Sequence, residues 1–355
     1  MHSAGVAMVL AMSSLWLTVA PAVAPARGSR EAVPACLRLP AMAGLLLPLR
    51  LALLLAATLD VQATLLLDED FSCASMGCNA SHGITNYSYW RWSTTGSRQA
   101  HMAIRPASGG RTGNEIDFSV DWCPPPNPNP KHLGCYRSEL ALQRAVESSL
   151  IDWTRGVGSS VRWFGFSNRL QNYSWDSAVP LNGPSFQLHA AGALPAWKGK
   201  HPVLNLQVDA TGCAERDTDC PKWTLGISGG GTPHPGCSEG YDMCWVLGPA
   251  MTADGLDGWN DWVISWQGSP LAERGHVAVW RNGKPVLSQQ TLMTAYNDSA
   301  APYLKFGIYH SGWKGSHPAS QVTARHAGMS YGAVKVGDET SSFDEVSTRQ
   351  APAAA

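Results

Sequence analysis

The sequence predicts an all-β sandwich or barrel. Short apolar or alternating runs recur along the chain, clusters of Gly, Pro, Asn and Asp separate them, and sustained helical periodicity is nearly absent. The 355 residues include 35 Gly, 24 Pro and 15 Trp, and 44% are hydrophobic. This composition excludes a disordered or coiled-coil chain and provides for one large core.

The charge balance excludes some classes of partner. Only 15% of the residues are charged, and 26 Lys and Arg stand against 27 Asp and Glu. Proteins that bind nucleic acids normally show a clustered basic excess. We therefore expect no nucleic acid as a partner, and no Gly-rich phosphate loop or nucleotide motif is present.

The N-terminal part resembles a leader. An apolar run at residues 51–59 is followed, after Asp60, by Val61-Gln62-Ala63, a small-residue exit that suits signal peptidase. A membrane anchor is the less favoured alternative, because a spanning helix needs about 20 apolar residues. We predict that Met42 is the true initiator and that Thr64 is the mature N-terminus.

This start divides the chain into three expected parts. Residues 1–63 are an upstream extension and signal peptide, residues 64–338 form the β domain, and residues 339–355 are a disordered tail rich in Ser, Thr and Ala. We expect a secreted, extracellular monomer that has no membrane contact after signal cleavage. The four N-x-S acceptor sites agree with glycosylation on that route: Asn79, Asn86, Asn172 and Asn297.

The cysteines agree with this division. Cleavage removes Cys36 and leaves eight cysteines, each close in sequence to a neighbour. Eight cysteines permit 105 pairings, and the last two pairs could be nested, but local bridges are the economical prediction. Zinc is the alternative, although the spacings are not those of a zinc ribbon. The predicted bridges join residues 73 to 78, 123 to 135, 213 to 220 and 237 to 244.

Eight runs are predicted as strands. After the sixth run, Asn282-Gly283 favours a type I′ hairpin turn because both residues tolerate positive φ. The runs are Glu115–Trp122, Ser160–Phe166, Ser185–Ala190, Val203–Val208, Trp262–Trp266, His276–Trp280, Tyr303–Tyr309 and Met329–Val336.

Three strands alternate polar and apolar residues in the same way. Because side chains two apart share a face of a strand, each strand places its polar set on one side. Gly307 would open space between its neighbours. One polar face, a groove suited to an extended anionic chain, is therefore predicted from Ser185, Gln187 and His189, from Tyr303, Lys305 and Tyr309, and from Arg137 and Glu139.

Each of these residues also has an ordinary structural explanation. A histidine on a strand is often solvated or hydrogen-bonded, an Arg and Glu pair is often a surface ion pair, and a tyrosine often packs with its hydroxyl satisfied. Tryptophans serve cores as well as sugar-binding clefts. For the cleft we select Trp197, Trp245 and Trp313, which lie close to loops and to the polar strands.

Four ordered motifs resemble the β-jelly-roll polysaccharide lyases. They are YRSEL at 136–140, FQLH at 186–189 followed by HPVLNLQV, WNDWV with GHVAVWRNGK, and YLKFGIY at 303–309. The resemblance spans about Asp68 to Val336. It is closest to heparin lyase I and glucuronan lyase, and more distant to alginate lyases. It implies a β-jelly-roll (concanavalin-like) sandwich that needs no cofactor.

The resemblance also implies β-elimination on a uronate-containing polysaccharide, without a hydrolytic water. Gln187 and Arg137 match the positions that neutralise the uronate carboxylate. His189 matches the base and Tyr309 the acid or acid/base. Which of the two removes the proton depends on the substrate epimer. Lys305 is placed to hold anionic groups, Glu139 to orient Arg137, and Tyr303 to bind substrate.

The substrate stays open among glucuronan, alginate and sulfated glycosaminoglycan. The mature chain is slightly acidic, with 22 basic against 25 acidic residues once four arginines and two acidic residues leave with the leader. A polyanion must therefore meet a local basic strip. The Gly- and Pro-rich segment from Cys213 to Cys244 could remodel the groove.

Two other functions remain as alternatives. The strand Glu115-Ile-Asp117-Phe-Ser119-Val-Asp121 resembles that of sandwich-fold β-glucanases, but Asp121 lies six residues from Glu115, about 20 Å along a strand, against the roughly 5 Å that a retaining pair needs. A non-catalytic glycan-binding module would use the same sandwich. Asp254 and Asp257 could donate to a structural calcium ion, although turn formation explains them better.

Overall fold

The computed structural model describes most of the predicted domain. The described residues are 65–71, 90–94, 100–108, 111–122, 137–142, 150–171, 182–191, 200–211, 213, 219–237, 240–250, 258–314, 322 and 325–348. Several predictions fall outside them: the leader and its cleavage site, Cys73, Cys78, Cys123 and Cys135, the acceptor sites at Asn79, Asn86 and Asn172, Trp197, and the pair Asp254 and Asp257.

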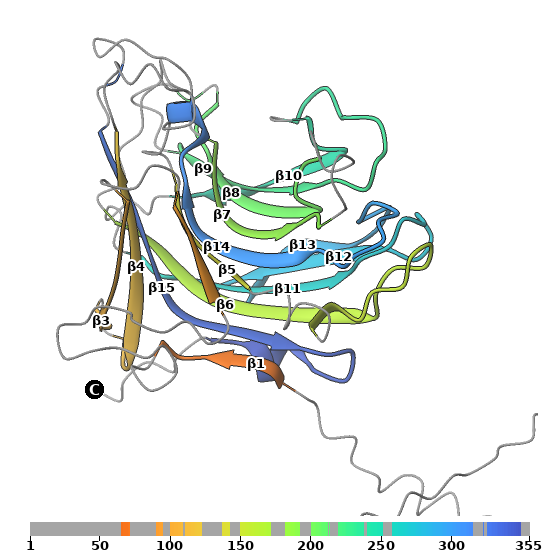
Figure 1. The fold of residues 1–355 in the computed structure, drawn as a ribbon, viewed down its shortest axis with the longest axis horizontal. Coiled ribbons are helices and arrows are strands. Elements are labelled where there is room, and N and C mark those ends of the chain that lie inside the picture. The colour runs from red at the N-terminus through yellow and green to blue at the C-terminus, as the bar shows by residue number, and fades with distance from the viewer. Residues whose placement is uncertain are drawn as a thin grey trace, which may run out of the picture. The chain divides into compact units, whose positions relative to one another are not determined.

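The described strands form two antiparallel sheets, which confirms the all-β sandwich (Figure 1). The eight-stranded sheet runs in the order β13-β12-β11-β6-β15-β4-β3, with β1 also paired to β15. Its strands are β1 (Leu65–Glu69), β3 (Ala100–Pro106), β4 (Asn114–Asp121), β6 (Val161–Gln171), β11 (Asn260–Gln267), β12 (His276–Arg281), β13 (Lys284–Thr291) and β15 (His326–Gly337).

The seven-stranded sheet runs in the order β10-β9-β8-β7-β14-β5-β2. Its strands are β2 (Trp90–Thr94), β5 (Arg137–Leu142), β7 (Asn182–His189), β8 (Leu204–Asp209), β9 (Lys222–Ile227), β10 (Met243–Pro249) and β14 (Tyr303–Tyr309).

The core between the sheets is made by the apolar positions of the alternating strands. Phe186 stacks on Phe166 of the other sheet, with ring centroids 4.2 Å apart, and Phe306 packs against Tyr331 at 4.9 Å. All four rings are fully buried. Each such side chain stabilises the fold by roughly 1.5–3 kcal/mol. The Tyr331 hydroxyl keeps a partner by donating to the Ser185 carbonyl oxygen at 2.5 Å.

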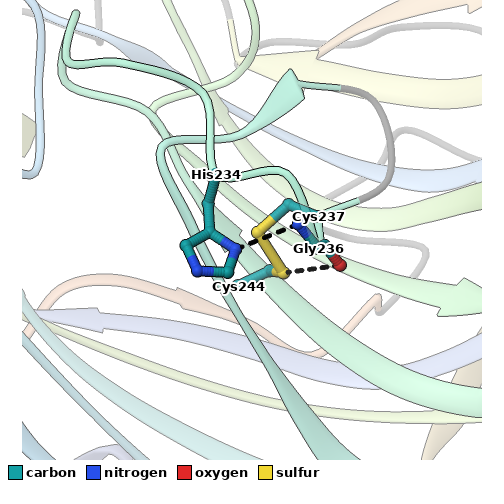
Figure 2. Close-up of a disulfide and its surroundings, with 4 residues drawn as sticks. All are labelled: His234, Gly236, Cys237 and Cys244. Atoms are coloured by element: carbon teal, nitrogen blue, oxygen red, sulfur yellow. Dashed lines mark hydrogen bonds between the residues drawn. A yellow bond between two sulfur atoms is a disulfide. The ribbon is translucent and has the colours of Figure 1, made fainter.

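Local chemistry explains the tight turn and two of the disulfides. Asn282 and Gly283 have φ values of 52° and 77° between β12 and β13, as the type I′ prediction requires. The bridges Cys213–Cys220 and Cys237–Cys244 are confirmed, and the nested alternative is excluded. The second bridge closes a loop in which the Gly236 N–H donates to His234 Nδ1 at 3.1 Å (Figure 2).

The C-terminal segment differs from the expected disordered tail as far as Thr348. The short helix α4 (Phe343–Val346) begins at a capping box formed by Ser342 and Glu345. Val346 is fully buried, and its carbonyl oxygen lies where a Cβ on Gly165 of β6 would stand. The segment is therefore part of the packed domain, because an apolar residue and a glycine gap fit together.

Candidate active site

The predicted polar residues converge on adjacent strands of the seven-stranded sheet. β14 lies between β7 and β5, and the register pairs Lys305 with Gln187 and Tyr303 with His189. On the other side it pairs Tyr309 with Arg137 and Gly307 with Glu139. Residues paired directly across antiparallel strands share a face, so these side chains lie on one surface, which we call the polar face.

The opposite side of the same strands belongs to the core. Leu304, Phe306 and Ile308 of β14 are buried at 2% exposure or less, and Phe186, Leu188 and Leu140 are fully buried. The alternation read from the sequence therefore orients all three strands. It anchors the polar face from beneath through apolar packing.

Glu139 is the centre of the polar face. Its carboxylate accepts hydrogen bonds from Gln187 Nε2 at 2.8 Å and from Lys305 Nζ at 2.8 Å, and Arg137 Nε lies 3.1 Å away. The Glu139 side chain is 1% exposed and that of Lys305 is 5% exposed, whereas that of Arg137 is 28% exposed. One carboxylate thus holds an amide, an ammonium and a guanidinium group from three strands in fixed positions.

The surroundings keep Glu139 ionised despite its burial. Burial alone would raise the pKa of this carboxyl group, but the charges of Lys305 and Arg137 outweigh burial and lower the pKa below its usual value. An ionised Glu139 leaves the outer side of this cluster with two positive charges against one negative charge. That excess is a local attraction for an anion on a chain whose overall charge is close to zero.

Arg137 also contacts the phenol of the site. Its guanidinium carbon lies 4.5 Å from the centre of the Tyr309 ring, in cation–π geometry. Glu139 therefore positions Arg137, and Arg137 in turn packs on Tyr309. The predicted bracing of Arg137 by Glu139 is confirmed by the 3.1 Å ion pair.

His189 is held as a neutral imidazole of defined tautomer. Its Nδ1 lies 3.0 Å from the Ala190 carbonyl oxygen, which can only accept a hydrogen bond, so Nδ1 carries the proton and Nε2 carries the lone pair. Burial, followed by the Lys305 charge, lowers the pKa of His189 to about 4. The ring packs against Tyr303 with centroids 5.2 Å apart. A neutral imidazole beside cations can accept a proton at neutral pH.

Some selected residues lie elsewhere. Trp313 belongs to the core at 5% exposure and stacks on His310 with ring centroids 3.9 Å apart, since it follows β14 in a short 3-10 turn (η3, Ser311–Lys314) and not in the strand. Trp245 packs against the core opposite Leu225. Ser185 is buried next to a bulge, and its hydroxyl donates to the Leu206 carbonyl oxygen.

The structural role of Gly307 differs from the expected one. Its φ is +137°, and a Cβ there would stand 2.4 Å from the Ser138 carbonyl oxygen and 2.6 Å from Glu139 Cα. The glycine therefore allows the β14 and β5 backbones to approach closely and does not open space between side chains. This approach carries Glu139 toward Lys305.

Sequence reasoning missed the continuation of the polar face across β8. Asn205 pairs with Gln187 and stands on the same face, and its Nδ2 donates to Gln207 Oε1 and to Tyr241 Oη, both at 2.6 Å. The alternation Leu204-Asn205-Leu206-Gln207-Val208 is the signal that could have found the two amides. Tyr241 comes from a loop and has no such signal.

The carboxylates of the glucanase-like strand lie on the other sheet. Glu115 is fully buried on the outer side of β4 and accepts hydrogen bonds from Arg105 Nε at 2.8 Å, Arg169 Nη2 at 3.0 Å and Ser108 Oγ at 3.0 Å. Asp121 instead lies 2.6 Å from His326 Nδ1. This arrangement explains Glu115 as the centre of an ion-pair cluster, whereas Asp121 pairs with a different residue.

Comparison with known proteins agrees with this geometry. The family model described as "Polysaccharide lyase" matches residues 86–324, which include every strand that carries the polar face. The chain belongs to the polysaccharide lyase family. A search of the curated proteins finds no match. The fold class and the enzyme class expected from the sequence are therefore both confirmed.

Solved structures place this polysaccharide lyase among sandwich proteins. The endo-β-1,4-glucuronan lyase of the fungus Trichoderma reesei is 15% identical, with a TM-score of 0.53, over 81% of this chain and 100% of that chain. The alginate lyase vAL-1 from Chlorella virus is 12% identical, with a TM-score of 0.40, over 78% of this chain and 100% of that chain. The first likeness supports the shared fold, and the second is too low to add to it.

Two further properties concern the described residues only. They contain no helix with the length and apolar character needed to cross a membrane. Within the same part of the chain, no group of three or more His, Cys, Asp or Glu side chains is arranged to hold a metal ion. The expectation that no cofactor is required stays a prediction.

Proposed function

We propose that this polysaccharide lyase cleaves a uronate-containing polysaccharide by β-elimination on the polar face. The observation that carries the proposal is the cluster around Glu139, which holds one amide and two cations beside a neutral imidazole and a phenol. Neutralising a carboxylate and moving a proton are the two tasks of the reaction, and the face contains groups for both.

The first task belongs to Gln187, Arg137 and Lys305. A uronate carboxylate that lies against these groups would receive hydrogen bonds and positive charge, which makes the neighbouring C5 proton more acidic. The donors are held before substrate arrives because Glu139 orients them. Preorganised donors cost no reorganisation while the charge on the carboxylate develops.

The second task belongs to His189 and Tyr309. A base removes the C5 proton, the electron pair of that bond forms the C4–C5 double bond, the C4–O bond breaks, and an acid returns a proton to the leaving oxygen. In one arrangement His189 Nε2 is the base and the Tyr309 phenol is the acid. In the other, Tyr309 serves as both, and the substrate epimer decides between the two.

The substrate class follows from the charge of the face. Glucuronan and alginate, the polymers named for the two solved structures above, are the first to test, with sulfated glycosaminoglycan as the third. The local excess of cations suits any of them. Tyr303, which packs on His189, offers a ring surface to the sugar.

The decisive experiment incubates the purified domain with each polymer and follows the ultraviolet absorbance of the unsaturated uronate. His189→Ala and Tyr309→Phe should each lower kcat about 10²–10⁴-fold, the usual contribution of a positioned acid or base. His326→Ala, a histidine on the eight-stranded sheet, is the matched control and should retain turnover. Full activity of both site variants would refute the assignment.

We also propose that the protein is secreted as a glycosylated monomer. The two described disulfides support an oxidising compartment, and the exposed acceptor Asn297 supports glycosylation there. Sequencing the N-terminus of secreted protein should give Thr64. A mature chain that retains earlier residues would contradict the predicted cleavage.

A further inference from the structure

The polar face changes in character from β7 towards β9. The register aligns Lys305, Gln187, Asn205 and Gly226 in one row across β14, β7, β8 and β9, all on the same face. Toward β5 and β14 the row is flanked by partly exposed groups, including Arg137, His189 and Tyr309. On β8, Asn205 is 0% exposed and Gln207 is 2% exposed. Polar residues on this end are therefore covered.

Tyr241 is the side chain that covers them. A Cβ on Gly226 would stand 2.7 Å from the Tyr241 ring, so the ring lies directly on the backbone of β9 on the side of the polar face. Its hydroxyl lies 2.6 Å from Asn205 Nδ2, which places the ring across β8 and β9. Gly226 is the residue that lets an aromatic ring lie flat at this point.

The loop that carries Tyr241 is fastened in several ways. The Cys237–Cys244 bridge closes it (Figure 2), and Cys244 is paired with Gly226. The Asp242 carboxylate accepts the backbone N–H groups of Gly229 at 2.7 Å and Gly231 at 2.8 Å. His201 packs against the ring with centroids 5.3 Å apart. Tyr241 is consequently 1% exposed and fixed in place.

We infer that Tyr241 determines the specificity for substrate length, because it anchors the loop that ends the substrate-binding surface beyond Gln187, over β8 and β9. Neighbouring strands are about 4.8 Å apart, so the ring on Gly226 stands roughly 10 Å from Gln187 along the row. Because the ring itself is 1% exposed, a polysaccharide lying along the row would meet the disulfide-closed loop that the ring anchors over β8 and β9, after a short stretch of sugar units. This inference rests on the proposed function and adds a limit to the number of units bound on one side of the cleaved bond.

Covered polar groups support the same conclusion. Asn205 Oδ1 is buried without a hydrogen-bond partner, although amide oxygens at this depth normally have one. Removing the ring would release the loop that it holds over this oxygen and over the amide of Gln207, and a sugar hydroxyl could then reach them. The row would then continue as a binding surface over β8 and β9.

The test uses oligouronides of increasing length, labelled at the reducing end, to map the units bound on each side of the cleavage point. In the wild-type protein, the number of sugar units bound on one side of the cleavage point should have a sharp upper limit. Tyr241→Ala should move that limit outward by one or more units and leave the other side unchanged. Tyr241→Phe keeps the ring and should behave as wild type. Unchanged limits in Tyr241→Ala would overturn the inference.

Gly226→Ala gives an independent route to the same displacement. The added methyl group would overlap the ring, so the ring must move, and the new side chain itself is small. We expect the same outward shift as in Tyr241→Ala, with the fold checked by thermal unfolding. A folded Gly226→Ala protein that binds the same number of units as wild type would count against the Tyr241 ring as the anchor of the barrier.

A binding readout separates this inference from the proposed reaction. The affinity for unlabelled oligoglucuronate and oligoalginate should stop increasing at a shorter length in wild type than in Tyr241→Ala. If no polymer gives an unsaturated product but this difference in length is found, the reaction is refuted and the barrier stands. Equal plateau lengths would refute the barrier even where unsaturated product forms.

Discussion

Two fully buried glutamates, one on each sheet, each organise a cluster of ion pairs and hydrogen bonds. Glu139 on β5 holds Lys305, Arg137 and Gln187, while Glu115 on β4 holds Arg105, Arg169 and Ser108. Both sit at outward positions of a strand whose other side enters the core. Burial and ion pairing are therefore shared by the two clusters and cannot by themselves indicate a reaction.

The neighbours of the two clusters differ. Around Glu139 the same strands bring an imidazole that is neutral and a phenol stacked on a guanidinium group. In the cluster around Glu115, which we call the outer cluster, Arg169 lies over the Trp259 ring at 5.0 Å, and Arg111, which pairs with Asp261, lies over the same ring at 4.7 Å. One cluster thus places charge next to groups that transfer protons. The other uses the same charges to fasten strands and loops of the eight-stranded sheet.

The largest expected effect separates the two glutamates by turnover. Glu139→Gln removes the charge that orients Arg137 and Lys305, and misplacement of such groups by about 1 Å costs about 10²-fold in rate. Glu115→Gln should leave kcat/KM within about twofold, because its partners lie on the other sheet. Each variant breaks a buried ion pair and should lose about 3–5 kcal/mol of unfolding free energy.

The measurement pairs initial rates on the active polymer with thermal unfolding of both variants. Their similar loss of stability makes Glu115→Gln a matched control for a general effect of weakening the fold. A comparable fall in turnover in both variants would show that the polar face depends on overall stability and not on Glu139 in particular.

The second expected effect is on the protonation of His189. Burial and the Lys305 charge lower its pKa to about 4, whereas Glu139 opposes them. The imidazole should therefore stay neutral from pH 7 down to about pH 5 and titrate near pH 4, with Nδ1 protonated. In Glu139→Gln the pKa should fall further, and in Glu115→Gln it should stay near 4.

Nuclear magnetic resonance of the imidazole nitrogens measures both the tautomer and the midpoint. As a consequence for activity, the basic form of His189 should be lost about tenfold per pH unit below its pKa. A midpoint near 6.5, the usual value for an exposed histidine, would show that burial and the Lys305 charge do not lower the pKa of this imidazole.

Strand periodicity explains which parts of the molecule could be predicted from sequence. Alternation predicts the positions of Gln187, His189, Lys305 and Tyr309, because it is a local property and one buried face orients every other residue of a strand. Gly307 was recognised as special, but its reason lies in the approach of β5, which is more than 160 residues away in sequence.

The remaining features depend on contacts that local patterns do not contain. Tyr241 reaches the polar face through a disulfide-closed loop and a glycine on another strand. Trp313 enters the core because a short turn follows β14, where alternation no longer applies. Glu115 is neutralised by Arg169, which lies 54 residues further along the chain. The position of each depends on how strands align, and that alignment is a property of the whole fold.

The smallest expected effect compares the carboxyl groups of the two clusters by pH. Burial, with the nearby Glu115 charge, raises the pKa of Asp117 above its usual value, whereas the pKa of Glu139 is lowered. Below the raised pKa the folded protein holds a proton on Asp117 that the unfolded chain has begun to release. Asp117 therefore contributes stability at low pH that is lost as the pH rises, and Glu139 contributes stability that is lost as the pH falls.

Asp117→Asn removes the ionised form from the outer cluster and keeps an oxygen to accept the Ser330 hydroxyl, which lies 2.5 Å from Asp117. Relative to wild type, Asp117→Asn should have the higher free energy of unfolding at pH 7, and this advantage should shrink or reverse at pH 4. Urea unfolding at the two pH values measures this difference. The opposite sign would mean that Arg105, which forms an ion pair with Asp117, dominates over burial, and the outer cluster would then resemble the Glu139 cluster in its electrostatics as well.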